Sequence, residues 1–200
     1  MTIRIGAWAW VVAALAYFVA EAIAAAAIEP SYSYATDYIS ELGVPGRSPQ
    51  AVLINAAFVT QAILFPAGAL LVARGVAAPR ASWFLAFAVL NGLGNLLVAT
   101  AHSGTGSKWH VAGAVLAIAG GNAAVLAGSA ALRRAGASRA YRAVSVVLGV
   151  LGLLCLLAMA VDTSHTVLPI GTWERGSVYP IFIWQTVTAG YLVGRRAERS

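Results

Sequence analysis

The sequence predicts an all-α fold: an integral membrane six-helix bundle that forms one transmembrane domain over residues 1–200. Three observations support this prediction. Hydrophobic residues make up 60% of the chain and charged residues 10%, whereas about a quarter of residues in soluble proteins are charged. Apolar segments recur along the chain, each close to the roughly 20 residues that cross a bilayer as a helix. Arginines gather in alternate connections between these segments, as they do on the cytoplasmic side of a membrane.

The expected spans cover nearly the whole chain. They comprise residues 7–28, 51–73, 82–101, 110–132, 141–161 and 177–194. The first span has an alternative interpretation as a cleaved signal peptide, because Arg4, an apolar stretch and the alanines at 24–27 resemble the parts of one. Its apolar length of about 22 residues exceeds the 7 to 15 residues of a signal-peptide core. We therefore expect this span to be retained.

The basic residues orient the bundle. Ten of the thirteen lie on the side that holds both termini: Arg4, Arg74, Arg80, Arg133, Arg134, Arg139, Arg142, Arg195, Arg196 and Arg199. Only Arg47, Lys108 and Arg175 lie on the opposite side. The positive-inside rule then places both termini in the cytoplasm, with the chain in a bacterial-type plasma membrane as a multi-pass protein. Because the arginines stand at span ends, the net charge of +6 is no sign of nucleic-acid binding, and the expected partner is the lipid bilayer.

The first outer connection, residues 29–50, is long and acidic. Asp37 suits the first turn of a helix, where the helix dipole favours an acid, so we expect a short helix over residues 37–42. At helical spacing Asp37 and Glu41 would share one face, and Tyr38 would contribute to an apolar face. The alternative is a solvated acidic turn.

Glu21 lies within the first span, about two turns from its outer end. A carboxylate at the bilayer centre costs about 2.5 to 3.5 kcal/mol on insertion scales. We expect Glu21 to be protonated, paired or facing water, with Tyr17 one turn away on the same face. An intramembrane acid is a functional candidate, and the alternative is a structural hydrogen bond between helices.

Amides form a polar stripe along the third span. Asn91 and Asn95 stand one turn apart, and the stripe continues to His102 at the outer end. Further polar residues that should point inward are Asn55, Asn122 and Gln185. Together they predict an interior that is more polar toward the outer face. Individually, each could instead be a hydrogen bond that joins two helices.

The histidines lie in the outer connections. His102 and His110 stand at facing ends of adjacent spans, and His165 follows Asp162 in the third connection, before Glu174. Three histidines with one acid could hold zinc with one position open for water. The spacing matches no known zinc motif such as HExxH.

Two alternatives to a metal site stay open. Ser103, Ser107 or Ser164 could act as a nucleophile with a histidine as base, although no GxSxG motif is present. The histidines and acids could also form a salt-bridged lid that closes the bundle.

Three segments carry a family resemblance: YSYATDYISELGVPGRSPQAVLINAAFV, HSGTGSKWHVAGA and ERGSVYPIFIWQ. They resemble the bacterial membrane family catalogued as domain of unknown function 998, in the turn at 40–43, in His110 and in Glu174-Arg175 followed by Pro180. The turn at 39–43 also resembles, more distantly, a eukaryotic six-span family that includes autophagy-modulating and GPI-lipid-remodelling membrane proteins. The resemblance implies a site on the outer or lumenal leaflet and a lipid substrate.

We therefore expect the chain to bind or modify a lipid or other amphiphile at the outer leaflet. The candidate catalytic residues are Glu21, Asp37, Glu41, His110, Asp162 and His165. The candidate substrate-binding residues are Arg175, Glu174, Asn55, Asn95, Gln185 and Tyr38, and the candidate metal ligands are His102, His110 and His165. The guanidinium of Arg175 suits an anionic headgroup, and the histidines and acids suit acid-base chemistry. The alternative is a non-enzymatic binding or accessory protein, or a small transporter.

Overall fold

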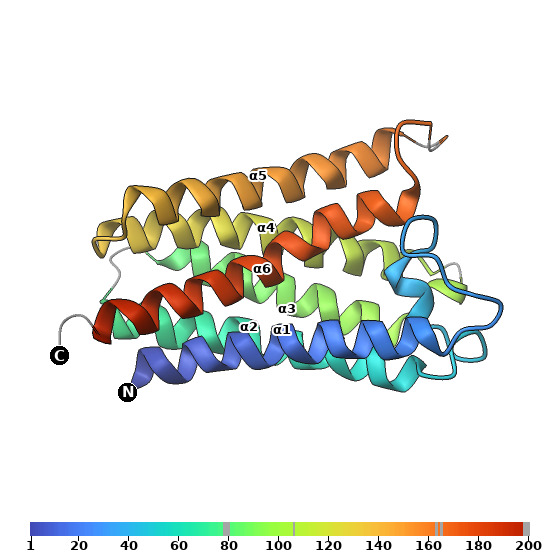
Figure 1. The fold of residues 1–200 in the computed structure, drawn as a ribbon, viewed down its shortest axis with the longest axis horizontal. Coiled ribbons are helices and arrows are strands. Elements are labelled where there is room, and N and C mark those ends of the chain that lie inside the picture. The colour runs from blue at the N-terminus through green and yellow to red at the C-terminus, as the bar shows by residue number, and fades with distance from the viewer. Residues whose placement is uncertain (78–80, 106, 163, 165, 198–200) are drawn as a thin grey trace.

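A computed structural model describes residues 1–77, 81–105, 107–162, 164 and 166–197. This part of the chain is helical and contains no strand (Figure 1). The long helices are α1 (Thr2–Ala26), α2 (Ala51–Gly75), α3 (Ser82–Thr100), α4 (Lys108–Arg134), α5 (Arg139–Val161) and α6 (Ile170–Ala197). Two short 3-10 helices, η1 (Ile39–Gly43) and η2 (Ser103–Thr105), lie in the connections. The predicted all-α fold with six long helices is confirmed.

The six helices form one bundle in which chain neighbours pack side by side. Each helix packs against the next, and α6 closes the bundle by packing against α1. The start of α1 and the end of α6 lie at one end of the bundle, called here the terminal end (Figure 1). The long connections with η1 and η2 lie at the opposite end, called here the hairpin end (Figure 1).

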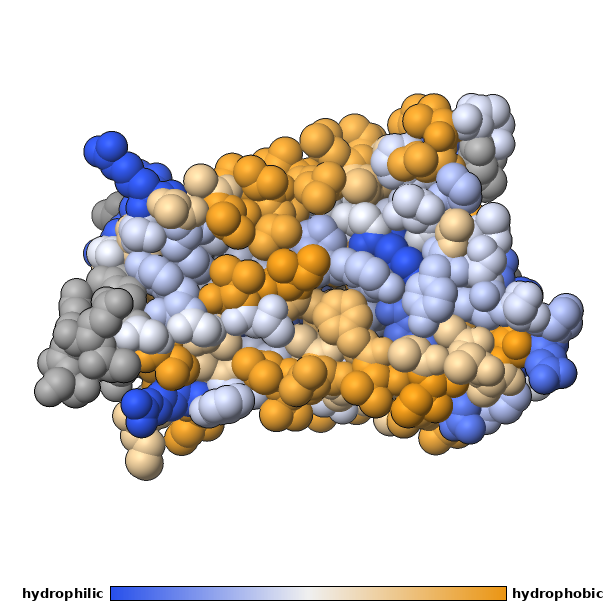
Figure 2. All heavy atoms as spheres, in the orientation of Figure 1, coloured by the Kyte–Doolittle hydropathy of each residue, from blue (hydrophilic) through white to orange (hydrophobic). Residues whose placement is uncertain are grey.

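Helices α1 to α5 are each long and apolar enough to cross a membrane. Helix α6 is of similar length but more polar, because its sequence includes Glu174, Arg175, Gln185 and Thr188, all of which are buried. Hydrophobic side chains form bands along the visible face of the bundle. Hydrophilic ones gather at its two ends and also in a patch between the bands, toward the hairpin end (Figure 2). The chain is thus a multi-pass membrane protein.

Small residues allow α3 and α4 to approach closely. A Cβ atom added at Gly113 of α4 would lie 2.6 Å from the Cβ of Leu97, and one at Gly120 would lie 2.9 Å from the backbone nitrogen of Asn91. In lipid, apolar burial gains little, and helices associate through such close contacts.

Aromatic rings fill the half of the bundle nearer the terminal end. The Trp10 and Trp184 rings are fully buried, with centroids 5.3 Å apart, and both contact Phe65 and Phe84. Trp10 Nε1 donates a hydrogen bond to the Phe65 carbonyl at 3.1 Å, which satisfies its polar atom. This half of the core is therefore densely packed with rings, and it also buries the polar side chains of Ser145, Gln185 and Thr188.

Two predicted boundaries are wrong at the hairpin end. Helix α6 begins at Ile170 instead of 177, so Glu174 and Arg175 lie inside a helix and not in a connection. The short helix begins at Ile39 instead of Asp37, because the Asp37 carboxylate accepts a hydrogen bond from the Ser33 backbone at 2.9 Å and closes a separate turn. Asp37 and Glu41 therefore do not share a helix face.

Candidate functional site

A buried ion pair joins the first and last helices. Arg175 Nη2 lies 3.0 Å from Glu21 Oε1, and Arg175 Nε donates to the same oxygen at 3.1 Å. The Tyr179 hydroxyl lies 3.0 Å from both oxygens of that carboxylate. Glu21 is 1% exposed and Arg175 is 7% exposed. Of the three states expected for this intramembrane acid, which were protonated, paired or facing water, the structure shows the paired one.

The Arg175 guanidinium also holds the first connection on top of the bundle. Its Nη1 donates to the carbonyls of Tyr34, Asp37 and Gly171 at 2.7, 3.0 and 3.2 Å. Its Nη2 donates to the Tyr32 hydroxyl, and burial raises the pKa of that phenol well above its ordinary value. These contacts engage each nitrogen of Arg175 within the protein. The predicted role of Arg175 as a ligand for an anionic headgroup stays a prediction.

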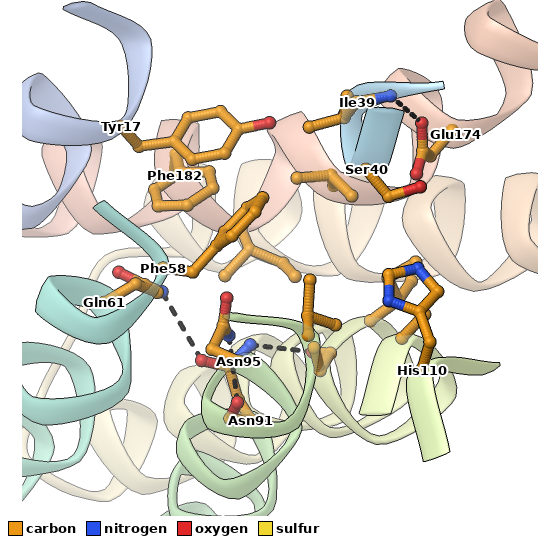
Figure 3. A pocket seen from close by; sticks show the side chains of 16 residues that line it. Tyr17, Ile39, Ser40, Phe58, Gln61, Asn91, Asn95, His110, Glu174 and Phe182 are labelled. Atoms are coloured by element: carbon orange, nitrogen blue, oxygen red, sulfur yellow. Dashed lines mark hydrogen bonds between the residues drawn. The ribbon is translucent and has the colours of Figure 1, made fainter. Parts of the chain in front are cut away.

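A small central cavity lies below η1. Its volume is about 50 Å³, room for about three or four water molecules. Aromatic walls come from Tyr17, Phe58 and Phe182 (Figure 3). The polar residues around it are Ser40, Gln61, Asn91, Asn95, His110 and Glu174.

Polar side chains at the floor of the central cavity form a hydrogen-bond network. Gln61 Nε2 donates to Asn91 Oδ1 at 3.4 Å, Asn91 Nδ2 donates to the Ala117 carbonyl at 2.7 Å, and Asn95 Nδ2 donates to the Asn91 carbonyl at 2.9 Å. The Asn95 side chain points up toward Phe58 (Figure 3). This network fixes the amides in place and links α2, α3 and α4.

A larger groove, called here the rim groove, adjoins the central cavity at the hairpin end. Its volume is about 640 Å³. Polar side chains come from η1 and the connections: Tyr38, Ser40, Glu41, Arg47, Ser103 and Ser107. Apolar side chains come from α4 and α5: Val111, Ala114, Val115, Ile118, Leu156, Met159 and Ala160. Ser40, His110 and Glu174 line both the rim groove and the central cavity, so these three residues stand at their junction.

Charges of both signs stand in the rim groove. Arg47 Nη2 lies 2.7 Å from Glu41 Oε2. Burial raises the pKa of the Glu41 carboxyl above its ordinary value, and Arg47 opposes this shift. The Glu174 carboxylate accepts a hydrogen bond from the Ile39 backbone nitrogen and so attaches η1 to α6.

The ring orientation of His110 is fixed by the chain. His110 Nδ1 lies 2.7 Å from the Ala101 carbonyl oxygen. Because a carbonyl only accepts hydrogen bonds, Nδ1 must carry the proton, and in a neutral imidazole Nε2 then holds a lone pair. His110 can therefore offer a base or an acceptor at the junction.

The other predicted site residues are placed apart from this junction. Asp162 closes the turn after α5, where it accepts hydrogen bonds from Thr166 and Val167 backbone nitrogens and from Trp173 Nε1, and these lower its pKa to about 2. Asn55 Nδ2 donates to the Gly43 carbonyl at 2.9 Å. Gln185 is fully buried and lines neither cavity.

The predicted zinc ligands lie partly outside the described residues. His165 lies outside the described residues, so the predicted zinc site of His102, His110 and His165 is not tested as a whole. Among the residues that the structure describes, no group of three histidine, cysteine or acidic side chains is close enough to hold a metal ion.

Sequence analysis did not single out Ser40, Gln61 or Arg47 as site residues. Ser40 and Arg47 belong to a polar connection, where such residues are common. Only the packing of this connection on the bundle, where η1 contacts α1, α2 and α6, gives them a place in a cavity. Gln61 carried a usable signal, since a glutamine within an apolar span is expected to face other helices.

Comparison with known proteins identifies the family. Residues 11–191 match the family described as "Protein of unknown function (DUF998)". The chain belongs to this family. The match confirms the resemblance to this family that was predicted from the sequence. No curated protein and no solved structure matched the chain.

Proposed function

We propose that this protein binds a lipid or another amphiphile in the rim groove. The polar part would enter past Glu41 and Arg47 and reach the junction at His110, and the hydrocarbon part would lie along α4 and α5. The observation that supports this most is the composition of the groove, which joins an ion pair and an imidazole to an apolar wall. Ligand pockets of several hundred Å³ with few placed polar groups are typical for small molecules.

The wall of the rim groove is continuous with the lipid-facing surface. Val111 and Val115 of α4 are 63% and 48% exposed, and both line the groove. In a membrane these side chains contact acyl chains, so a lipid tail can enter the groove without leaving an apolar surrounding.

We propose further that the rim groove faces the outer leaflet. The arginines at the terminal end, among the residues that the structure describes, are Arg4, Arg74, Arg133, Arg134, Arg139, Arg142, Arg195 and Arg196. The positive-inside rule places this end in the cytoplasm. The groove, at the hairpin end, then lies at the opposite surface of a bacterial plasma membrane.

Any chemical step on the bound amphiphile would involve His110 and Glu174. His110 Nε2 can accept a proton in its neutral form, and both side chains stand at the junction of the two cavities. In this proposal Glu21 and Arg175 support the site by fixing the first connection, because they line neither cavity.

Transport across the bilayer is the less favoured alternative. A transporter must open toward both sides, whereas Trp10, Phe65, Phe84 and Trp184 fill the half nearer the terminal end. Binding from one side accords with the position of the rim groove at the hairpin end and of the central cavity directly below η1.

Lipid analysis of the purified protein tests the proposal. Ala114 lines both cavities, and Ala112 is an exposed residue of the same helix that lines neither. We expect mass spectrometry to find an amphiphile retained by the wild type and by Ala112→Phe but lost from Ala114→Phe. Equal retention in the two variants, with both folded, would exclude the rim groove as the binding site.

A further inference from the structure

The central cavity holds polar groups that the protein itself leaves unsatisfied. The Tyr17 side chain is fully buried, and its hydroxyl, which interacts electrostatically with the Glu21 carboxylate, makes no hydrogen bond of ordinary geometry within the described residues. Figure 3 shows this hydroxyl directed toward the space beside Ile39 and Ser40. A buried hydroxyl without a partner costs about 1 to 3 kcal/mol. A group that enters the cavity and bonds to Tyr17 would remove this penalty.

The Gln61, Asn91 and Asn95 amides at the floor of the cavity already donate to one another or to backbone carbonyls, so the groups left for an occupant are mainly acceptors. The Glu174 carboxylate and the Nε2 lone pair of neutral His110 accept, and the Tyr17 and Ser40 hydroxyls can do either. No Lys or Arg side chain lines this cavity in the part of the chain that the structure describes. An occupant should therefore bring hydrogen-bond donors, and an anionic headgroup would meet no cation there.

Its size and walls limit the occupant further. A volume of about 50 Å³ admits about three or four water-sized groups, such as the carbon and oxygen atoms of a small diol. The Tyr17 and Phe182 rings are stacked with centroids 4.1 Å apart and form one apolar wall. Hydroxyl-bearing carbon atoms can pack on that wall while their oxygens meet the polar side.

We propose that the central cavity binds the uncharged, hydroxyl-bearing head of an amphiphile whose tail lies in the rim groove. This inference rests on the proposed function and deepens it, because it names the headgroup class. The head would pass the junction at Ser40, His110 and Glu174 and would contact Tyr17 below. A glycerol monoester is the simplest amphiphile with these properties.

Two esters of the same fatty acid provide the test. 1-Monoolein carries two free hydroxyls, and methyl oleate has the same acyl chain and ester without them. We expect native mass spectrometry of the full chain in micelles to show monoolein bound about tenfold more tightly, the equivalent of one or two hydrogen bonds. Oleic acid has the same acyl chain with an anionic head, and it should not bind more tightly than monoolein.

Variants that remove one hydroxyl connect this preference to the cavity. Tyr17→Phe keeps the stacked ring and Ser40→Ala keeps the backbone of η1, so each deletes only a hydroxyl. We expect each to weaken monoolein binding about three- to tenfold and to leave methyl oleate binding unchanged. Thr100→Ala is the matched control, because the Thr100 hydroxyl donates to the Leu96 carbonyl of its own helix and lies outside both cavities.

The possible results separate the two proposals. If monoolein and methyl oleate bind equally, and both are lost from Ala114→Phe, the rim groove binds amphiphiles but the headgroup inference is wrong. Tighter binding of oleic acid, or a hydroxyl preference unchanged in Tyr17→Phe and Ser40→Ala, also overturns the inference. If no ester binds and Ala114→Phe has no effect, both proposals fail. Thermal unfolding of each variant verifies that it is folded.

Discussion

The Arg175 guanidinium lies 3.0 Å from the Glu21 carboxylate, across 154 residues of sequence. This ion pair joins α1 to α6 where the first connection crosses the bundle. Since Arg175 also donates to three backbone carbonyls, it fixes the segment that leads into η1. The walls of both cavities therefore depend on one buried arginine.

Replacing Arg175 with methionine should destabilise the protein strongly. Loss of one partner leaves a buried charge uncompensated, which costs about 3 to 5 kcal/mol. We expect unfolding of Arg175→Met in detergent at lower temperature and lower denaturant concentration than the wild type. The double variant with Glu21→Gln should recover part of the loss because no buried charge remains. A single variant as stable as wild type would contradict this role.

Close packing of α3 on α4 gives a second prediction. A side chain at Gly94 would meet the backbone of Gly113 and Ala117, and neither can move away easily. Gly94→Val should cost about 1 to 3 kcal/mol through overpacking, measured as the free energy of unfolding in detergent. Gly190→Ala is the control, because nothing lies within 4 Å of a Cβ atom there. Equal stability of the two variants would show that this contact does not hold the helices together.

The number and order of the helices were predictable from the sequence because each needs only its own apolar length. The start of α6 was not. Glu174 and Arg175 lower the local hydropathy, so they suggested a connection, yet both are buried in the helix because Ile39, Glu21 and Tyr32 supply partners. Those partners lie far away in the sequence, and hydropathy along one segment contains no information about them.

The site was predictable only as a set of residue types at one end of the bundle. Packing decides which of them share a cavity. Asp162 accepts a hydrogen bond within its own turn, and Asn55 donates one to the Gly43 carbonyl. In contrast, Ser40, His110 and Glu174 come from three separate segments and lie together at the junction of the two cavities. No spacing rule connects these three residues.

Asp162 gives a prediction about pH. Its hydrogen bonds lower the folded-state pKa from an ordinary 3.8 to about 2. A lowered pKa means that the carboxylate stabilises the folded state fully above about pH 4 and that this contribution is lost as the pH falls through about 2. We expect Asp162→Asn to unfold at a lower temperature than wild type at pH 7. The difference should shrink steadily below pH 4, and a constant difference down to pH 2 would contradict the assignment.

The orientation of the bundle gives the last prediction. Cys155 is buried, so a Cys155→Ala background permits single cysteines to be placed at either end. Ser31 lies in the first connection and Ala140 in the first turn of α5, and both are exposed. If the terminal end is cytoplasmic, a membrane-impermeant maleimide added to intact cells should label Ser31→Cys. It should label Ala140→Cys only after lysis. The reverse pattern would place the rim groove on the cytoplasmic side, and the outer-leaflet amphiphile proposed as its ligand would then be wrong.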